Sequence, residues 1–163
     1  MGARRAAGQR VRAVQLNAGT GRLDSAWAVC EHGAVSEDCI FCGIVRGDIP
    51  AIKVDEDEHT IAFMDIAPWH RGHALVIPRR HVRDISEASP DDVAHVIRAA
   101  QRLAGRMRER LGHGDVTLAN AMGEAAGQTV FHLHVHVVPG LDVDVPRRTP
   151  EPGELEEIAA KLR

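Results

Sequence analysis

The longest periodic pattern in the chain is a helix signal that opens with the tetrapeptide Ser89-Pro90-Asp91-Asp92. Ser89 is typical of a helix N-cap, proline suits the first helical position, and Asp92 can close a capping box. Apolar residues then recur at the 3.6-residue spacing of one helix face. They are Val93, Val96, Ile97, Ala100, Leu103, Ala104, Met107 and Leu111. The pattern predicts one long amphipathic helix that ends at Gly112.

Short apolar segments flank this helix on both sides and predict the strands of a sheet. The segments are residues 51–54, 60–65, 74–77, 116–120 and 129–139. Residues 40–46, followed by Gly47, predict a short helix, and residues 154–162 predict another near the end of the chain. Together these elements predict an α+β fold: an antiparallel five-stranded sheet with one long helix and short terminal helices.

The last predicted strand, TVFHLHVHVVP, has histidines at positions 132, 134 and 136. Because side chains alternate between the two faces of a strand, all three imidazoles are expected on one face, roughly 6.5–7 Å apart. The other face is expected to be buried by Phe131, Leu133, Val135 and Val137. Three imidazoles buried side by side would each need a polar partner, so the pattern indicates chemistry rather than a structural role.

Two kinds of chemistry fit three such histidines: a zinc site, or attack on phosphorus by a neutral imidazole to form a covalent intermediate. The glycine-containing segment 123–128 and Thr129 lie directly upstream and offer hydrogen-bond donors for phosphate oxygens. An isolated histidine has a pKa near ~6.5 and is mostly neutral at pH 7. These features favour attack on phosphorus over a zinc site, with the central His134 as the nucleophile and His136 as a group that assists at the phosphate.

Composition and charge exclude several partner classes. The chain has 163 residues, enough for one domain, and a formal net charge of −3, which gives no argument for nucleic-acid or membrane attraction. No apolar run approaches the ~20 residues of a membrane span. The arginines of the long helix lie mostly off its apolar face, as expected of a solvated surface. We therefore expect neither nucleic acid nor membrane as a partner.

Residues 1–37 are rich in Gly, Ala and Arg without sustained periodicity, and predict a loosely ordered extension before a folded domain at 38–163 that includes a short C-terminal tail. The extension has no acidic residue before Asp24, a feature of organellar transit peptides, but it contains few serines. Three cysteines make no disulfide framework. A cytoplasmic location is the expectation.

The segment GEAAGQTVFHLHVHVVP resembles the signature of the histidine triad (HIT) family of nucleotide hydrolases and transferases. The resemblance extends back through CIFCGIVRGDIP, AFMDIAP and RGHALVIPRRH, and covers residues 39–139. It implies a purine nucleotide substrate, phosphoramidate or dinucleoside polyphosphate, whose α-phosphorus is attacked by His134 to give a nucleotidyl-histidine intermediate. It also implies a HIT-like fold, phosphoramidase or pyrophosphohydrolase activity, a homodimer and no organic cofactor.

The same resemblance assigns substrate contacts to individual positions. Phosphate contacts fall on Gly127, Gln128, Thr129 and His136. Asp65 matches the carboxylate that bonds the ribose hydroxyls, and His73 matches a further histidine near the active site, for which a plain structural role is equally plausible. The positions that match the base pocket are Ile40, Phe41, Ile44, Phe63 and Ile66, which also suit an ordinary core.

The pair Cys39-x-x-Cys42 has three interpretations: a redox pair, two buried small side chains, or metal ligands. The pair resembles the C-x-x-C of HIT proteins that hold zinc with two cysteines and two histidines. In this chain the matching histidines are His81 and His132. That resemblance implies a structural, tetrahedral zinc that fixes the short helix to the histidine strand.

Two positions depart from the family pattern. Ala121 stands seven residues before the motif glutamine, where the family often has Asn, Gln or Asp, and Asn120 is expected on the opposite face. Gly140 follows Pro139 where many relatives have Arg. Two other hypotheses stay open besides covalent catalysis by His134. One is a nucleotide-binding regulatory module with little turnover, and the other is a hydrolase that uses the three histidines as zinc ligands.

Overall fold

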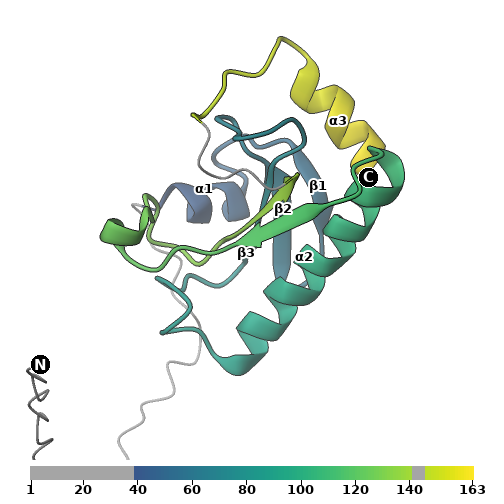
Figure 1. Cartoon of the computed structure of the whole chain (residues 1–163). Helices are drawn as coiled ribbons and strands as arrows, with labels where there is room; N and C mark the ends of the chain where they lie inside the picture. Colours follow the sequence, from purple (N-terminus) through teal and green to yellow (C-terminus); the bar gives the residue numbers. More distant parts are fainter. Residues whose placement is uncertain (1–38, 141–145) are drawn as a thin grey trace, which may run out of the picture. The chain divides into compact units, whose positions relative to one another are not determined.

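A five-stranded antiparallel sheet with strand order β1-β2-β3-β5-β4 forms the centre of the protein (Figure 1). The computed structural model describes residues 39–140 and 146–163, so the predicted extension 1–37 lies outside the described residues. The strands are β1 Lys53–Glu56, β2 Thr60–Met64, β3 Ala74–Pro78, β4 Val116–Ala119 and β5 Val135–Pro139. The predicted α+β class and sheet are confirmed.

In the described residues, three α-helices accompany the sheet: α1 Ile40–Arg46, α2 Pro90–Arg110 and α3 Glu154–Leu162. The long helix begins as predicted, because the Ser89 hydroxyl accepts from the Asp92 amide at 3.1 Å and the Asp92 carboxylate accepts from the Ser89 amide at 3.1 Å. Within the described ranges, no helix is long and apolar enough to cross a membrane.

The two faces of the sheet carry two separate cores, as the period of two along the strands requires. Ala62 and Met64 of β2 pack with α2 and α3 in one core. The intervening Ile61 and Phe63 pack with α1 in the other. Figure 1 shows α2 running along one side of the sheet, while α1 lies on the other side. The segment 129–139, called the histidine segment below, therefore joins a core on its α2 side and faces α1 on the other side.

The first strand is shifted by two residues from its prediction, and spans Lys53–Glu56 instead of 51–54. The reason is a tight turn made by Asp57, whose Oδ1 accepts from the amides of His59 and Thr60 at 2.9 and 2.7 Å. This turn leaves Glu56 free to pair with Ile61 of β2. Asp55 and Glu56 therefore lie in the strand, and Asp57 makes the turn.

The prediction of one continuous histidine strand over 129–139 is wrong in its first half. The strand β5 begins at Val135, so only His136 lies within it. Before it, the His132 amide donates to Val130 O at 2.9 Å, and the Leu133 amide donates to Val82 O at 2.6 Å. These bonds turn the backbone out of the strand path. The three imidazoles nevertheless lie on the α1 side, since the Phe41 ring contacts those of His132 and His134, and the His134 ring is 5.0 Å from that of His136. Leu133, Val135 and Val137 pack in the core with α2, whereas Phe131 is 36% exposed instead of buried.

Candidate active site and metal centre

A cavity of about 390 Å³ opens on the α1 side of the sheet, next to the histidine segment. Its apolar wall includes the five residues predicted to form a base pocket: Ile40, Phe41, Ile44, Phe63 and Ile66. Its polar wall contains Asp65, Thr129, His134, His136 and Arg147. One side of the cavity thus suits a flat apolar ring, and the other suits a charged, hydrogen-bonding group.

His134 is held with one ring nitrogen available for attack. Its Nδ1 lies 2.7 Å from the carbonyl oxygen of His132, which can only accept, so the proton sits on Nδ1. Nε2 consequently keeps its lone pair. Asn120 fixes the backbone at this point, because its Nδ2 donates to His134 O at 2.8 Å. Burial lowers the pKa of His134, which favours the neutral, nucleophilic ring.

A chain of hydrogen bonds from the Trp69 amide through His73 fixes the tautomer of His136. The Trp69 amide donates to His73 Nδ1 at 3.2 Å, so His73 must carry its proton on Nε2. That Nε2–H donates to His136 Nδ1 at 2.9 Å. The neutral His136 therefore carries its own proton on Nε2. The relay leaves His136, which lines the cavity, with an N–H donor for a phosphate oxygen.

The pair formed by His73 and His136 makes stability sensitive to acid. Burial lowers the pKa of His73 to about 4, against the favourable charge of Asp65, and also lowers the pKa of His136. Arg147 and His134 shift the pKa of both groups in the same downward direction. Because the unfolded chain binds these protons near its ordinary pKa of 6.5, unfolding takes up protons as the pH falls.

We expect the free energy of unfolding to decrease as the pH falls from about 6.5 toward 4, by up to about 1.4 kcal/mol per pH unit for each histidine. Urea unfolding of the protein at pH 7, 6 and 5 measures this slope. The variant His73→Gln is expected to have a shallower slope. A slope unchanged in His73→Gln would contradict this assignment.

The glycine-containing loop is organised by the side chain of Gln128. Its Oε1 accepts from the Gly123 amide at 2.8 Å, and its Nε2 donates to Arg83 O at 2.8 Å and Val130 O at 3.2 Å. Gln128 is 1% exposed, and Gly127 has φ of 91°, a conformation suited to glycine. Thr129 lines the cavity, whereas Gln128 shapes the loop beside it. The predicted phosphate contacts of Gly127 and Gln128 stay predictions.

Asp65 lies at the other end of the polar wall and is 8% exposed. Its Oδ1 accepts from the Ala67 amide at 2.8 Å, and its Oδ2 accepts from Arg147 Nη1 at 2.7 Å. The guanidinium of Arg147 also lies 4.0 Å from the centre of the Trp69 ring. Sequence reasoning missed both Arg147 and Trp69.

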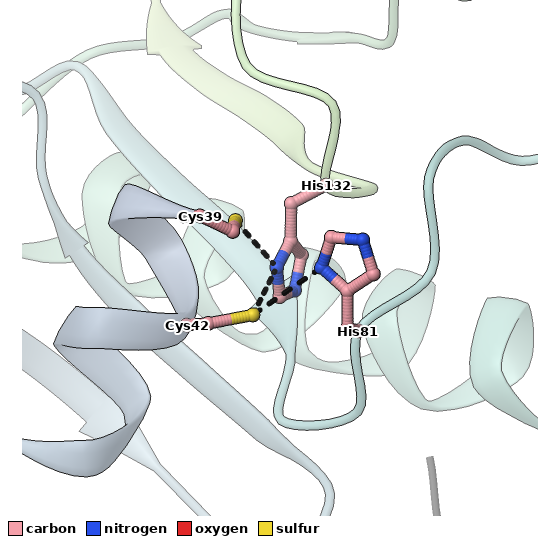
Figure 2. Close-up of side chains that lie close together, drawn as sticks. All are labelled: Cys39, Cys42, His81 and His132. Carbon is pink, nitrogen blue, oxygen red and sulfur yellow. Dashed lines mark hydrogen bonds between the residues drawn. The ribbon is translucent and has the colours of Figure 1, made fainter. Parts of the chain in front are cut away.

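Four potential zinc ligands converge between α1, the end of β3 and the histidine segment (Figure 2). Cys42 Sγ lies 3.2 Å from His81 Nδ1 and 3.6 Å from His132 Nδ1. Cys39 Sγ lies 3.5 Å from His132 Nδ1. In a tetrahedral zinc site, sulfur and nitrogen ligands are about 3.5 Å apart, since Zn–S is about 2.3 Å and Zn–N about 2.0 Å. The donor set and its spacing fit zinc.

The remaining nitrogen of His132 supports this ligand set. His132 Nε2 lies 2.9 Å from the carbonyl oxygen of Pro78 and must donate to it. Nδ1 therefore carries the lone pair that points toward the two sulfurs, as a metal ligand requires (Figure 2). His132 and Cys42 are both 0% exposed. The cluster offers four protein ligands and is largely closed to solvent.

The family model for the HIT domain matches residues 46–143. The chain belongs to the HIT family. Its fold class, predicted from the sequence, is shared with solved HIT structures. One of these is a zinc-bound histidine triad family protein from Mycobacterium smegmatis, 42% identical, with a TM-score of 0.68, covering 77% of this chain and 93% of that structure.

Two HIT relatives are named for their activities. An adenosine 5′-monophosphoramidase of Schizosaccharomyces pombe is 36% identical, in an alignment that covers 77% of this chain and 98% of the relative. An adenylylsulfatase of Arabidopsis thaliana is 32% identical over 114 residues, which are 70% of this chain and 58% of the relative. This HIT protein is thus similar to hydrolases of adenosine nucleotides.

Proposed function

We propose that this HIT protein cleaves nucleoside phosphates at the α-phosphorus through a covalent intermediate on His134. The observation that carries the proposal is the 2.7 Å contact between His134 Nδ1 and the carbonyl oxygen of His132, which sets the tautomer of His134. Its Nδ1–H is bonded to His132 O, so the lone pair lies on Nε2, and its ring lines the cavity beside His136. The carbonyl of His132 also stabilises the positive charge that develops on the ring when Nε2 forms a bond.

The proposed reaction has two displacements. His134 Nε2 donates its electron pair to the α-phosphorus, and the bond from phosphorus to the leaving group breaks with its electron pair. The oxygen of water or of another acceptor then bonds to the same phosphorus and loses its proton to solvent, and the N–P electron pair returns to Nε2. In both steps the His136 Nε2–H is the donor for a phosphate oxygen, as its relay from Trp69 and His73 supports.

The cavity supports a purine nucleotide as the substrate. Its apolar wall, built from α1 and β2, suits the flat face of a base, with Phe41 in edge contact with both Phe63 and the His134 ring. Asp65 has the carboxylate oxygens that two adjacent ribose hydroxyls require as acceptors. Adenosine is the first base to test, because the two hydrolase-named relatives act on adenosine nucleotides by their names.

We further propose that Cys39, Cys42, His81 and His132 hold a structural zinc ion. Four protein ligands fill a tetrahedral site, so no position is left for a catalytic water. This argues against the alternative in which zinc performs the hydrolysis. When bound, the metal would fix His132, whose carbonyl oxygen sets the tautomer of His134. Zinc in this proposal supports the nucleophile without taking part in its chemistry.

A homodimer and a cytoplasmic location complete the proposal. Among the described strands, β4 lies at one edge of the sheet, and its Leu118 is 43% exposed. An edge strand with an exposed apolar side chain can pair with a second copy. The mass of the purified protein in solution, measured by light scattering, tests this part.

The substrate assay that tests the proposal compares adenosine 5′-phosphoramidate, diadenosine polyphosphates and the guanosine phosphoramidate by kcat/KM. The expected result is release of the nucleoside monophosphate from at least one of them. Nucleotide binding without release of product from any of the three would favour the regulatory-module alternative instead.

A further inference from the structure

The cavity presents one permanent positive charge among the described residues that line it, the guanidinium of Arg147. The phosphates of a nucleotide are anionic, and so are many of the groups that leave from them. Phosphate sites in proteins usually supply a fixed cation for such groups. Arg147 is therefore the one described residue of the cavity wall that can serve as this cation.

Arg147 is placed beside the histidines by three contacts. It donates to Asp65 Oδ2 and to Ala67 O, at 2.7 and 2.8 Å, and it stacks over Trp69. The Trp69 ring is itself 4.7 Å from the His136 ring, centre to centre. One aromatic ring thus separates the guanidinium from the histidine that is proposed to hold the phosphate.

The chain on the C-terminal side of Arg147 is pinned independently of the cavity. The Arg148 amide donates to Pro68 O at 2.9 Å, and its guanidinium pairs with Glu154 at the start of α3. This anchor fixes the backbone of the segment against the sheet domain. The position of Arg147 at the cavity is therefore built into the fold and does not depend on the ion pair with Asp65.

The ion pair between Arg147 and Asp65 competes with the ribose when a nucleotide binds as proposed. Asp65 is the proposed acceptor for the two ribose hydroxyls, and each of its oxygens already accepts one bond, from the Ala67 amide and from Arg147. The ribose and Arg147 therefore compete for Oδ2. The Arg147 side chain is 40% exposed, so water screens the guanidinium side of this ion pair and weakens it. Ribose hydroxyls can therefore displace the guanidinium, which has five N–H donors and a nearby anionic phosphate to receive them.

We propose that Arg147 selects the leaving group: freed from Asp65 by the ribose, it binds the anionic group that departs from the α-phosphorus. This inference rests on the proposed function. A phosphate or sulfate leaving group departs with the electron pair of the broken P–O bond as an anion, which a guanidinium stabilises. An amine leaving group departs with the electron pair of the P–N bond and takes up a proton, so it gains little from Arg147. The protein consequently favours nucleotides with anionic leaving groups.

The test measures kcat/KM of Arg147→Gln and Arg147→Lys on two substrates, diadenosine triphosphate, which loses ADP, and adenosine 5′-phosphoramidate, which loses an amine. We expect Arg147→Gln to lower kcat/KM for diadenosine triphosphate by about 10- to 100-fold, the range of one charge-assisted bond, and for the phosphoramidate by less than about 3-fold. Arg147→Lys, which keeps the charge, is expected to recover much of the loss.

The matched control is Arg83→Gln, because Arg83 also lies over an aromatic ring, Phe131, at 4.3 Å, but outside the cavity wall. It is expected to behave as wild type on both substrates. An equal loss on both substrates, or no loss on either, overturns the inference, and thermal unfolding of each variant verifies that the fold is intact. If the wild-type protein turns over neither substrate, the proposed function fails instead.

Discussion

Replacement of His134 by alanine is expected to reduce kcat by on the order of 10⁴-fold or more, because it removes the atom that bonds to phosphorus. Nucleotide binding is expected to survive, since the base wall and Asp65 are unchanged. Steady-state kinetics on the best substrate of the panel and calorimetric titration with AMP measure the two effects separately.

The control for this variant is His59→Ala, which removes an exposed histidine remote from the cavity wall. It should keep wild-type kcat. The account is contradicted if His134→Ala retains turnover within about tenfold of wild type, because no covalent route through that residue would then be needed.

Replacement of Cys39 and Cys42 by serine together is expected to remove zinc and destabilise the protein strongly. The cluster ties α1 to the end of β3 and to the histidine segment, so loss of the metal releases all three. Structural zinc contributes to the folding free energy directly. A loss of about 3–5 kcal/mol would lower Tm by roughly 10 °C or more for a chain of this size. Metal analysis and thermal unfolding of the purified variants measure both effects.

Cys30→Ser is the matched control, because it removes a cysteine outside the C-x-x-C motif. Both this variant and the wild type are expected to bind one zinc per chain. Wild-type protein without stoichiometric zinc would end the zinc proposal. Chelation separates the structural role from a catalytic one: a structural zinc predicts that activity declines with unfolding, whereas a catalytic zinc predicts immediate loss in folded protein.

Much of the fold was predictable because its signals are local. The capping box of Ser89 and Asp92 starts α2 where the sequence indicates, and α3 spans the residues that the pattern predicts. The shift of β1 had a different origin: the Asp57 side chain closes a turn through bonds to backbone amides, and composition alone does not reveal which acidic residue does so.

The histidine segment shows where the period-of-two argument reached its limit. Alternation assumes a continuous strand, but backbone bonds from Leu133 to Val82 and from His132 to Val130 bend the chain before β5. The resemblance to the HIT family named four side chains that do meet in one cluster, because it encodes three-dimensional proximity that spacing along the chain does not. The alternation of faces nevertheless holds across the bend, because His132 and His134 both contact the Phe41 ring while Leu133 packs in the core with α2.

Other contributors to the site had no signal in the sequence pattern. Trp69 acts through its backbone amide and ring, and Asn120 through a bond to the His134 carbonyl. Arg147 comes from a polar tail without periodicity and meets Asp65, 82 residues earlier in the chain. Such contacts depend on how distant segments meet, so only the folded structure reveals them.

Isolation of the nucleotidyl adduct is the decisive measurement. Wild-type protein would be mixed with its best substrate, quenched within one turnover, digested and analysed by mass spectrometry. The account predicts a nucleoside monophosphoryl group on the peptide that contains His134, lost on longer incubation with water and absent in His134→Ala. Turnover without any such adduct, or an adduct on another residue that persists in His134→Ala, would contradict it.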